Sequence, residues 1–477
     1  MREIKKVLDN GFCIGCGVCT AAENTMKESP IAMELNSAGS YQARIIATDR
    51  NESSSRADKV CPFSDSAPNE DFLADKRFSG IVKNYQKRIG FFDKIYAGYV
   101  AEGDYRNRAS SGGTISWMID QLFINNEIDF VVHVKPSEDN GPVILKYQIS
   151  SCEEDAKKRS KSSYYPVELS EVLKFVKDNP GRYAVVGIPC FIKAINSLRH
   201  LDTIFEEKIV FTIGLICGHL KSTRYADFLA MNAGVQPGSL TEIDFRTKIE
   251  GNNVNDYGIT AKGKSIDGEL VERTVLNRDI FGASWGYGLF MPKSCEYCDD
   301  VFAETADMVV GDAWMPEFLN DSKGANVVLV RNPVMAKIIH EARLNKQLSF
   351  REISTDELLA TQDGCMRQRG EALAFRLYGE SKAGRWVPKK RVEKSISGLN
   401  RKLRVKYGIR QKLTLESKEI SQRLDRDKVT LGLYKKAFKP LMNRYDKQDR
   451  PLWRRIASKI KWRLIALRSF VKVLKAE

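Results

Sequence analysis

Four cysteines near the start of the chain have the spacing of iron–sulfur ligands. Cys13, Cys16 and Cys19 are separated by two residues each, and Cys61 follows 42 positions later, directly before a proline. Such a thiolate set suits a cubane cluster, because the small glycines between the cysteines let the backbone pass close to an inorganic core. Zinc competes, although structural zinc usually takes two separated Cys or His pairs. Disulfides are the remaining alternative, and cysteines this close in a chain without an export signal rarely pair.

Four later cysteines form a second candidate set. Cys190 and Cys217 each follow a predicted strand, and Cys295 and Cys298 form a C-x-x-C motif. Parallel strands bring their carboxyl ends to one edge of a sheet, where open α/β folds place their sites. The spacing therefore allows a second 4Fe-4S cluster, with zinc or plain core cysteines as the alternatives.

Two features outside the cysteine sets could bind phosphate or flavin. A Ser-Gly-rich turn precedes the amphipathic run 114–123, and a capped helix start beside glycines can cradle a diphosphate, although an ordinary capped turn has the same sequence. Arg246 and Lys248 lie on one side of a predicted strand, where they could hold phosphate or the charge of a reduced flavin, or be solvated. The turn consists of Ser110, Ser111, Gly112 and Gly113.

The elements that must position these residues begin with a small domain at residues 1–65. Two partly alternating runs, 31–35 and 41–46, flank a Gly-containing turn and predict a β-hairpin that returns Cys61 to the triplet. Residues 66–90 are polar and mixed, and we expect a linker with helical pieces. The domain is expected to be a ferredoxin-like α+β fold.

Strands and helices alternate from about residue 91. Continuous β-branched runs of this kind favour a parallel or mixed sheet covered on both faces by helices. We expect an α/β catalytic domain over residues 91–380. Four strands are predicted, at residues 95–100, 130–134, 183–187 and 208–215.

The positive charge of the chain is concentrated in a predicted helical extension at residues 381–477. This extension holds 30 Lys and Arg against 8 Asp and Glu, a net charge of +22, whereas the remaining 380 residues have a net charge of −7. The asymmetry favours an appended module with its own partner. Within it, residues 451–475 have an apolar stripe flanked by cations, which fits an interfacial helix on anionic lipid, a helix packed on its own protein, or a partner-binding helix. Nucleic acid is not an expected partner, because few aromatic residues interleave with the charges.

No export signal or membrane-spanning run is visible in the sequence. Ten cysteines without such a signal point to reduced thiols or metal ligands, and we therefore expect the protein in the cytoplasm. If the basic extension binds lipid, the protein would also contact the inner face of the membrane. Cys152 and Cys365 show no partner pattern and are interpreted as structural.

The ordered motifs resemble the coenzyme F420 hydrogenase/dehydrogenase beta-subunit family of iron–sulfur flavoproteins, including its branch associated with polysaccharide loci. The resemblance covers about residues 1–330, and its order carries more weight than any single motif. The matching segments are 13–19 with Cys61 and Pro62, 110–113, 161–164, 187–190, 217–218, 245–248, 295–298, 303–307 and 311–314.

This resemblance implies an FAD in the catalytic domain with one cluster packed beside it. It implies that Cys190, Cys217, Cys295 and Cys298 hold that cluster. The flavin contacts that it implies are Ser110, Ser111, Gly112, Gly113, Lys161, Tyr164, Arg246 and Lys248. The segment after Lys161 is one residue longer than the family pattern. Asp312 is expected to position the cluster loop, and His219 to hydrogen-bond a cluster sulfur or face solvent.

The resemblance implies an oxidoreductase that takes single electrons from a ferredoxin-like donor. Two 4Fe-4S clusters would pass them to FAD, and FAD would deliver a hydride equivalent to an organic substrate, sugar-derived in the polysaccharide branch. The alternative is an electron-transfer subunit that docks a catalytic partner and has no substrate of its own. Coenzyme F420 is a third candidate as the flavin's reaction partner. No residue pattern identifies a proton donor.

Overall fold

The N-terminal part of the molecule contains the predicted hairpin. In the computed structural model, β1 (Ile31–Leu35) pairs antiparallel with β2 (Tyr41–Ile45), which confirms this prediction. The Asn36 side chain accepts hydrogen bonds from two backbone N–H groups of the turn, and Gly39 adopts a φ of 75° that closes it. The structure describes residues 1–23, 29–46, 55–139, 141, 143–152 and 161–449.

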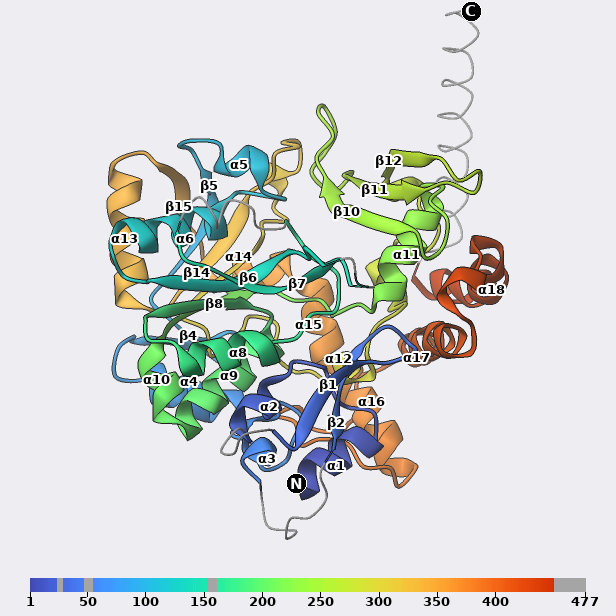
Figure 1. The fold of residues 1–477 in the computed structure, drawn as a ribbon, viewed down its shortest axis with the longest axis horizontal. Coiled ribbons are helices and arrows are strands. Elements are labelled where there is room, and N and C mark those ends of the chain that lie inside the picture. The colour runs from blue at the N-terminus through green and yellow to red at the C-terminus, as the bar shows by residue number, and fades with distance from the viewer. Residues whose placement is uncertain (24–28, 47–54, 140, 142, 153–160, 450–477) are drawn as a thin grey trace, which may run out of the picture.

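Three short helices complete this part, shown in blue at the bottom of Figure 1. They are α1 (Arg2–Asp9), α2 (Val18–Ala22) and α3 (Arg56–Val60). A capping box between Ser55 and Asp58 starts α3, and the Asp58 carboxylate also accepts a hydrogen bond from the Ile4 N–H at 2.8 Å. This bond ties α3 to α1, and Cys61 follows directly at the end of α3.

The segment predicted as a linker with helical pieces contains regular structure. It contains α4 (Glu70–Phe78), β3 (Asn84–Gln86) and the start of β4 (Gly90–Phe92). Buried Glu70 at the start of α4 forms an ion pair with buried Lys193 at 3.2 Å. The segment is therefore anchored to the body of the protein.

A mixed eight-stranded sheet forms the centre of the molecule, as the apolar runs predict. All four predicted strands occur in it, and its spatial order is β15-β5-β14-β13-β9-β8-β6-β7. The neighbours β13, β9, β8 and β6 are parallel, and the outer pairs are antiparallel. The strands are β5 (Lys94–Val100), β6 (Phe130–Pro136), β7 (Leu145–Ser150), β8 (Tyr183–Gly187), β9 (Ile209–Leu215), β13 (Met308–Asp312), β14 (Asn326–Val330) and β15 (Leu348–Glu352).

Helices cover both faces of this sheet, which explains why its central strands β8, β9, β13 and β14 are largely apolar. On one face, α6 (Thr114–Ile124) and α13 (Pro333–Leu344) bury Trp117 and Ile339 against strand residues such as Val328. The other face packs against three helices that bury Leu173 and Phe191. These helices are α8 (Ser170–Asp178), α9 (Pro189–Leu201) and α10 (Thr203–Lys208). Figure 1 shows the two layers above and below the sheet.

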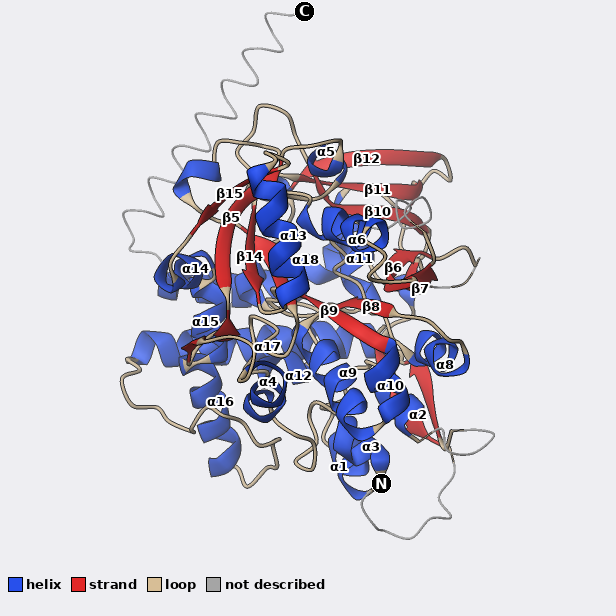
Figure 2. Cartoon of the chain, turned by 90° about the vertical axis from the view of Figure 1, so that its left-hand side faces the viewer, coloured by secondary structure: helices blue, strands red, loops and turns tan. Residues whose placement is uncertain are grey.

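A second, three-stranded antiparallel sheet lies at the top of the molecule as drawn in Figures 1 and 2, with α11 beneath it. It consists of β10 (Leu240–Thr247), β11 (Gly258–Lys264) and β12 (Leu270–Leu276), and α11 spans Thr223–Asn232. Short elements lie around the two sheets. They are α5 (Tyr105–Arg108), η1 (Asn277–Asp279), η2 (Trp285–Tyr287), α12 (Lys293–Glu296) and η3 (Pro316–Phe318).

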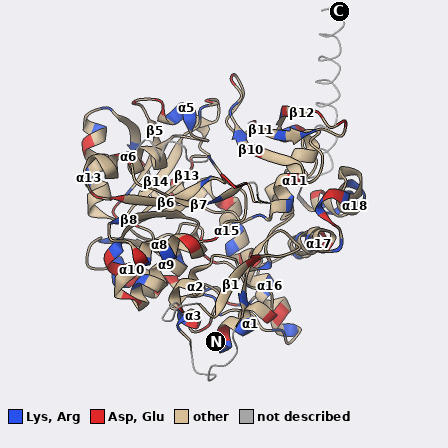
Figure 3. Cartoon of the chain, viewed as in Figure 1, with Lys and Arg blue, Asp and Glu red and all other residues tan. Residues whose placement is uncertain are grey.

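The C-terminal helices pack against the body of the molecule. Buried Leu413 of α17 and Phe438 of α18 belong to the same apolar core as the helices α8 and α9. Both signs of charge occur on α18 (Figure 3). The C-terminal elements are α14 (Thr355–Thr361), α15 (Asp363–Arg369), α16 (Glu371–Lys382), α17 (Arg401–Arg423), η4 (Arg426–Lys428) and α18 (Leu431–Asp449).

The interfacial helix predicted at residues 451–475 lies outside the described residues. Among the helices that the structure does describe, none combines the length and apolar character that crossing a membrane requires.

Candidate functional site

The first cysteine set converges on one buried space. Burial raises the pKa of the Cys16 thiol, and the neighbouring thiolates of Cys61 and Cys13 raise it further. Burial likewise raises the pKa of Cys19, with added repulsion from the other three, and raises that of Cys61 to about 12. Four thiols, three of them buried and that of Cys13 partly buried, repel one another as thiolates and need a positive group between them. A metal centre supplies one.

Glycines shape the loop between these cysteines. Gly15 and Gly17 have φ values of 76° and 79°, a conformation that other residues rarely adopt. A Cβ atom at Gly15 would lie 2.3 Å from the Tyr41 carbonyl oxygen, and one at Gly17 would lie 2.5 Å from Glu168 Oε2. The loop therefore needs glycine at both positions to turn three thiols inward.

Backbone N–H groups point at the thiols of this set. The Ala43 N–H donates to Cys13 Sγ at 3.4 Å, and N–H groups of Phe63 and Ser64 lower the pKa of Cys61 against the larger effect of burial. Such bonds stabilise a thiolate, which is the form that binds metal.

Four cysteine thiols are a donor set that a cubane iron–sulfur cluster takes. In the described residues, no group of three or more His, Cys, Asp or Glu side chains is arranged to hold one metal ion. A zinc ion draws four ligand atoms to about 2.0–2.3 Å around a single centre. A cubane takes its four thiolates at separate corners, so its ligands stand further apart.

The structure also brings the second cysteine set together. Burial raises the pKa of Cys190 well above its usual value, and the thiolates of Cys298, Cys295 and Cys217 raise it further. Cys190 lies in the first turn of α9 after β8, and Cys217 follows β9, so two adjacent parallel strands end here. The convergence expected at this sheet edge is present.

The two sets are neighbours. The Cys16 thiolate of the first set is among the charges that raise the pKa of Cys190 in the second. Tyr147 on β7 lies beside both, because after burial the charges of Cys190 and Cys16 are what raise its pKa. Its hydroxyl donates to the Val186 carbonyl at 3.0 Å. The arrangement places the two sets in series.

A cavity of about 400 Å³ opens beside the second set, and Cys217 is part of its wall. It lies beyond the carboxyl ends of four parallel strands, from which Val134, Val186, Leu215 and Asp312 line it. This is where open α/β sheets bind ligands, and the volume is in the range of cofactor pockets.

The Ser-Gly-rich turn forms one wall of this cavity. Ser110, Ser111 and Gly113 line it, and Gly113, with a φ of 86°, precedes the first residue of α6. Gly112 faces away, because a Cβ atom there would lie 2.6 Å from Asn326 Oδ1. The positive end of the α6 dipole therefore meets the cavity, as a flavin diphosphate requires.

The other four residues expected to contact flavin divide into two groups. Lys161 and Tyr164 line the cavity, and Lys161 forms an ion pair with Asp244 at 2.8 Å. Arg246 is buried behind the wall, where it pairs with Asp312. Lys248 donates to the Ser111 carbonyl oxygen at 3.2 Å and so holds the turn from behind. Arg246 and Lys248 support lining residues and are not part of the lining.

Two aromatic residues complete the wall next to the second cysteine set. His219 is buried, which excludes the solvent-facing alternative, and its ring centroid lies 4.3 Å from that of Trp285. Burial lowers the pKa of His219 well below its usual value, and the charges of Lys221 and Arg410 lower it further. Among the described residues its Nε2 atom has no hydrogen-bond partner. Trp285 carries no spacing signal, and only its place in a Gly-flanked loop marks it.

The loop that carries Trp285 is held by the C-terminal helices. Buried Arg410 of α17 donates to the carbonyl oxygens of Trp285 at 3.0 Å and Gly286 at 2.7 Å. Thr414 donates to the Gly288 carbonyl at 2.9 Å. The C-terminal extension therefore helps to build the cavity wall.

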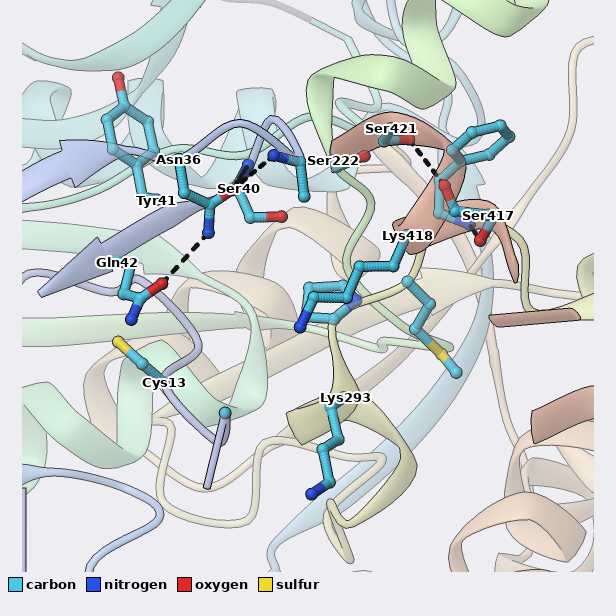
Figure 4. A pocket seen from close by; sticks show the side chains of 15 residues that line it. Cys13, Asn36, Ser40, Tyr41, Gln42, Ser222, Lys293, Ser417, Lys418 and Ser421 are labelled. Carbon is cyan, nitrogen blue, oxygen red and sulfur yellow. Dashed lines mark hydrogen bonds between the residues drawn. The ribbon is translucent and has the colours of Figure 1, made fainter. Parts of the chain in front are cut away.

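A smaller pocket lies beside the first cysteine set (Figure 4). The β1–β2 turn forms one side, with the Asn36 amide bonded to Gln42 at 3.2 Å, and α17 forms the other with Ser417 and Lys418. Cys13 lies below the turn in this view. The pocket brings the surface close to the first set.

Comparison with known proteins gave consistent matches. The family model for the N-terminal part of the coenzyme F420 hydrogenase/dehydrogenase beta subunit matches residues 95–174, and the model for its C terminus matches residues 181–356. One subunit of the F(420)H(2) dehydrogenase of Methanosarcina mazei is 24% identical over 349 residues, which are 72% of this chain and 85% of that protein.

Two further matches cover most of this chain. The coenzyme F420-dependent sulfite reductase of Methanocaldococcus jannaschii is 23% identical over 372 residues, 74% of this chain but 49% of that protein, so the chain spans about half its length. A chain in a structure of the F420-reducing NiFe hydrogenase complex from Methanosarcina barkeri aligns with a TM-score of 0.46 and 16% identity, over 63% of this chain and 96% of that one.

Proposed function

Because this chain belongs to the coenzyme F420 hydrogenase/dehydrogenase beta-subunit family, we propose that it is an iron–sulfur flavoprotein that exchanges single electrons with a protein donor and two electrons with an organic molecule. Iron–sulfur clusters carry electrons one at a time, and a flavin joins one-electron to two-electron chemistry. The relatives named as a dehydrogenase component and a sulfite reductase support a redox role.

One observation carries the proposal: two thiol sets and a cavity lie next to one another in the order first set, second set, cavity. Cys16 of the first set adjoins Cys190 of the second, and Cys217 of the second lines the cavity. We propose that each set holds a 4Fe-4S cluster and that the cavity holds FAD. In this arrangement the first set, beside the surface pocket at Cys13, is the side that meets a ferredoxin-like donor.

The protein's own residues bind, orient and exclude water. Ser110, Ser111 and the start of α6 would receive the flavin diphosphate, with Lys248 fixing the turn. Arg246, held by Asp312, places a buried positive charge behind the wall. Trp285 and His219 close the cavity beside Cys217 and keep bulk water from the second set. The organic substrate would enter along the remaining open wall.

An anaerobic absorption spectrum with quantified iron, sulfide and flavin tests this proposal. The full-length protein should contain about eight iron and about eight sulfide, as two four-iron clusters require, and one flavin per chain. A reconstituted protein that binds neither iron nor flavin would contradict it. A protein with about four iron would leave one thiol set without its proposed cluster and would contradict that part.

A second candidate function is an electron-transfer subunit that docks a separate catalytic partner. It is favoured by the relative whose name makes it one component of a larger dehydrogenase. Affinity capture from native cells separates the candidates, since an autonomous enzyme should turn over sugar-derived or coenzyme F420 substrates without a stable partner. A stoichiometric partner that is required for turnover would support the second candidate.

A further inference from the structure

Arg369 is a buried guanidinium against the second cysteine set. It is the last residue of α15 and is only 5% exposed. It lies beyond residue 356, where the matched family model ends, and no cysteine spacing points to it. Within the described residues, no carboxylate forms an ion pair with it. A buried, unpaired cation is costly unless something nearby carries negative charge.

The guanidinium bridges the two loops that carry three of the four thiols. One terminal nitrogen donates to the carbonyl oxygen of Cys295, and the other donates to that of Gly218, next to Cys217, at 2.6 Å. The planar fork of arginine can satisfy both carbonyls at once, whereas the single ammonium of lysine cannot hold the same geometry. Arg369 therefore fixes the distance between these loops.

A third donor of the same side chain is unused. The Nε atom is buried, and it has no hydrogen-bond partner in the part of the chain that the structure describes. Buried donors are rarely left unpaired, so an unpaired one marks a place for a group that the polypeptide does not supply.

The charge of Arg369 acts on the thiols directly. Burial is the larger effect and raises the pKa of Cys217, Cys295 and Cys298, and in each case the Arg369 charge is the strongest opposing influence. The neighbouring buried arginines have other partners, since Arg410 binds the carbonyls of the Trp285 loop and Arg376 binds that of Glu296. Lys221 also acts on Cys295, and Lys390 acts on Cys298, but Arg369 is the cation that acts on all three of these thiols.

We propose that Arg369 is a positioning residue of the second cluster that also raises the reduction potential of that cluster. This inference rests on the proposed function. Reduction adds one negative charge to a cluster, and a fixed positive charge in a low-dielectric surrounding stabilises the product. A second cluster that accepts electrons more readily favours transfer toward the cavity.

Redox titration of the full-length protein tests the proposal. Anaerobically purified wild type, Arg369→Gln, Arg369→Lys and the control Arg367→Gln are titrated with mediators and followed by electron paramagnetic resonance, with iron and sulfide quantified in each. Arg367 lies on the same helix and is exposed, and within the described residues its ion pair is with Asp363. It therefore controls for helix changes that leave the cluster untouched.

The variants separate the effect of the Arg369 charge on the potential from the effect of its hydrogen bonds to the two loops. Arg369→Gln should lower the equilibrium constant for reduction of one cluster at least tenfold, which is a shift of 59 mV to more negative potential, and leave the other unchanged. Arg369→Lys should keep the equilibrium constant for reduction of this cluster within tenfold of the wild-type value. It should lose iron from one cluster to a chelator at least several times faster than wild type. Arg367→Gln should change neither.

Three outcomes would overturn the inference. One is Arg369→Gln with full iron content and both potentials unchanged. If this variant loses about half its iron, the positioning role of Arg369 is supported, and Arg369→Lys then tests the effect of its charge. An equilibrium constant for reduction that falls more than tenfold in the lysine variant would overturn the proposed effect on the potential. The third outcome is wild-type protein without iron, which defeats the proposed function itself and is distinguishable from the other two.

Discussion

Replacing Arg410 with glutamine should loosen the cavity wall without unfolding the sheet. Arg410 is buried and donates to the carbonyl oxygens of Trp285 and Gly286. Glutamine is too short to reach both acceptors. The Trp285 carbonyl keeps a hydrogen bond from the Gly288 N–H at 3.3 Å, so within the described residues the substitution leaves the Gly286 carbonyl without its donor, at a cost of about 1–3 kcal/mol. Since the effect is local, it should appear in the opening equilibrium of the loop and leave the sheet stable.

Hydrogen–deuterium exchange by mass spectrometry measures this opening. At about 1.4 kcal/mol per tenfold, a loss of about 2 kcal/mol speeds exchange in residues 281–291 by roughly 30-fold. Peptides of β8 and β9 should exchange as in wild type. Thr414→Val removes one bond to the same loop and should give a smaller change, about fivefold for about 1 kcal/mol.

Arg423→Gln is the matched control on the same helix, because Arg423 is exposed and its ion pair, in the part of the chain that the structure describes, is with Glu419. The reasoning is refuted if Arg410→Gln leaves exchange in residues 281–291 within about twofold of wild type. It is also refuted if the sheet peptides lose protection equally, because the loop would then not be the element that Arg410 holds.

Three further predictions follow from single positions or segments. Gly17→Ala should destabilise the protein by at least about 1–2 kcal/mol and lower its iron content, because the φ of 79° at this position disfavours a side chain and the added Cβ would lie 2.9 Å from the Ser170 nitrogen. Gly80→Ala is the control, because a Cβ atom at Gly80 would meet open space. An unchanged iron content in Gly17→Ala would contradict the argument. Burial and the charges of Arg106, Lys161 and Arg246 lower the pKa of Lys248 to about 8. Between about pH 8 and 10.4 the unfolded chain therefore binds more protons than the folded protein, and the free energy of unfolding should rise with pH across this window. Lys248→Met should flatten that rise in denaturant titrations, and an equal rise in the variant would exclude Lys248 as its source. Deleting residues 451–475 should abolish binding to anionic vesicles if that segment is an interfacial helix, whereas equal binding by the shortened and intact proteins would rule out the lipid interpretation.

The sequence predicted the scaffold of the site well, and the physical reason is local. The four predicted strands are β-branched runs buried on both faces, so their pattern depends little on distant residues. The β1–β2 hairpin is set by its own Asn36 and Gly39 turn. Convergence of Cys190 and Cys217 followed from strand ends meeting at one edge. Each of these predictions needed only local patterns and a general rule of sheet topology.

The residues that sequence reasoning missed come from distant segments with no spacing signal. Tyr147 lies on β7, a strand whose mixed pattern did not mark it, and Trp285 lies in an irregular loop. Arg369 and Arg410 are two of many basic residues, and only the fold distinguishes the buried ones from the solvated ones. The basic composition after residue 381 favoured an appended module, and it did not show that α17 and α18 bury one face against the rest of the molecule, because net charge reports nothing about a helix's apolar stripe.

The central claim is that the two thiol sets and the cavity act in series, with the first set as the entry. Stopped-flow reduction of the bound flavin by a reduced ferredoxin tests it most directly, comparing wild type with Cys61→Ala. The variant should retain flavin and about four iron and be reduced at least about a hundredfold more slowly, since its electrons must bypass the first set. Flavin reduced at the wild-type rate in a variant that lacks the first cluster would contradict the account.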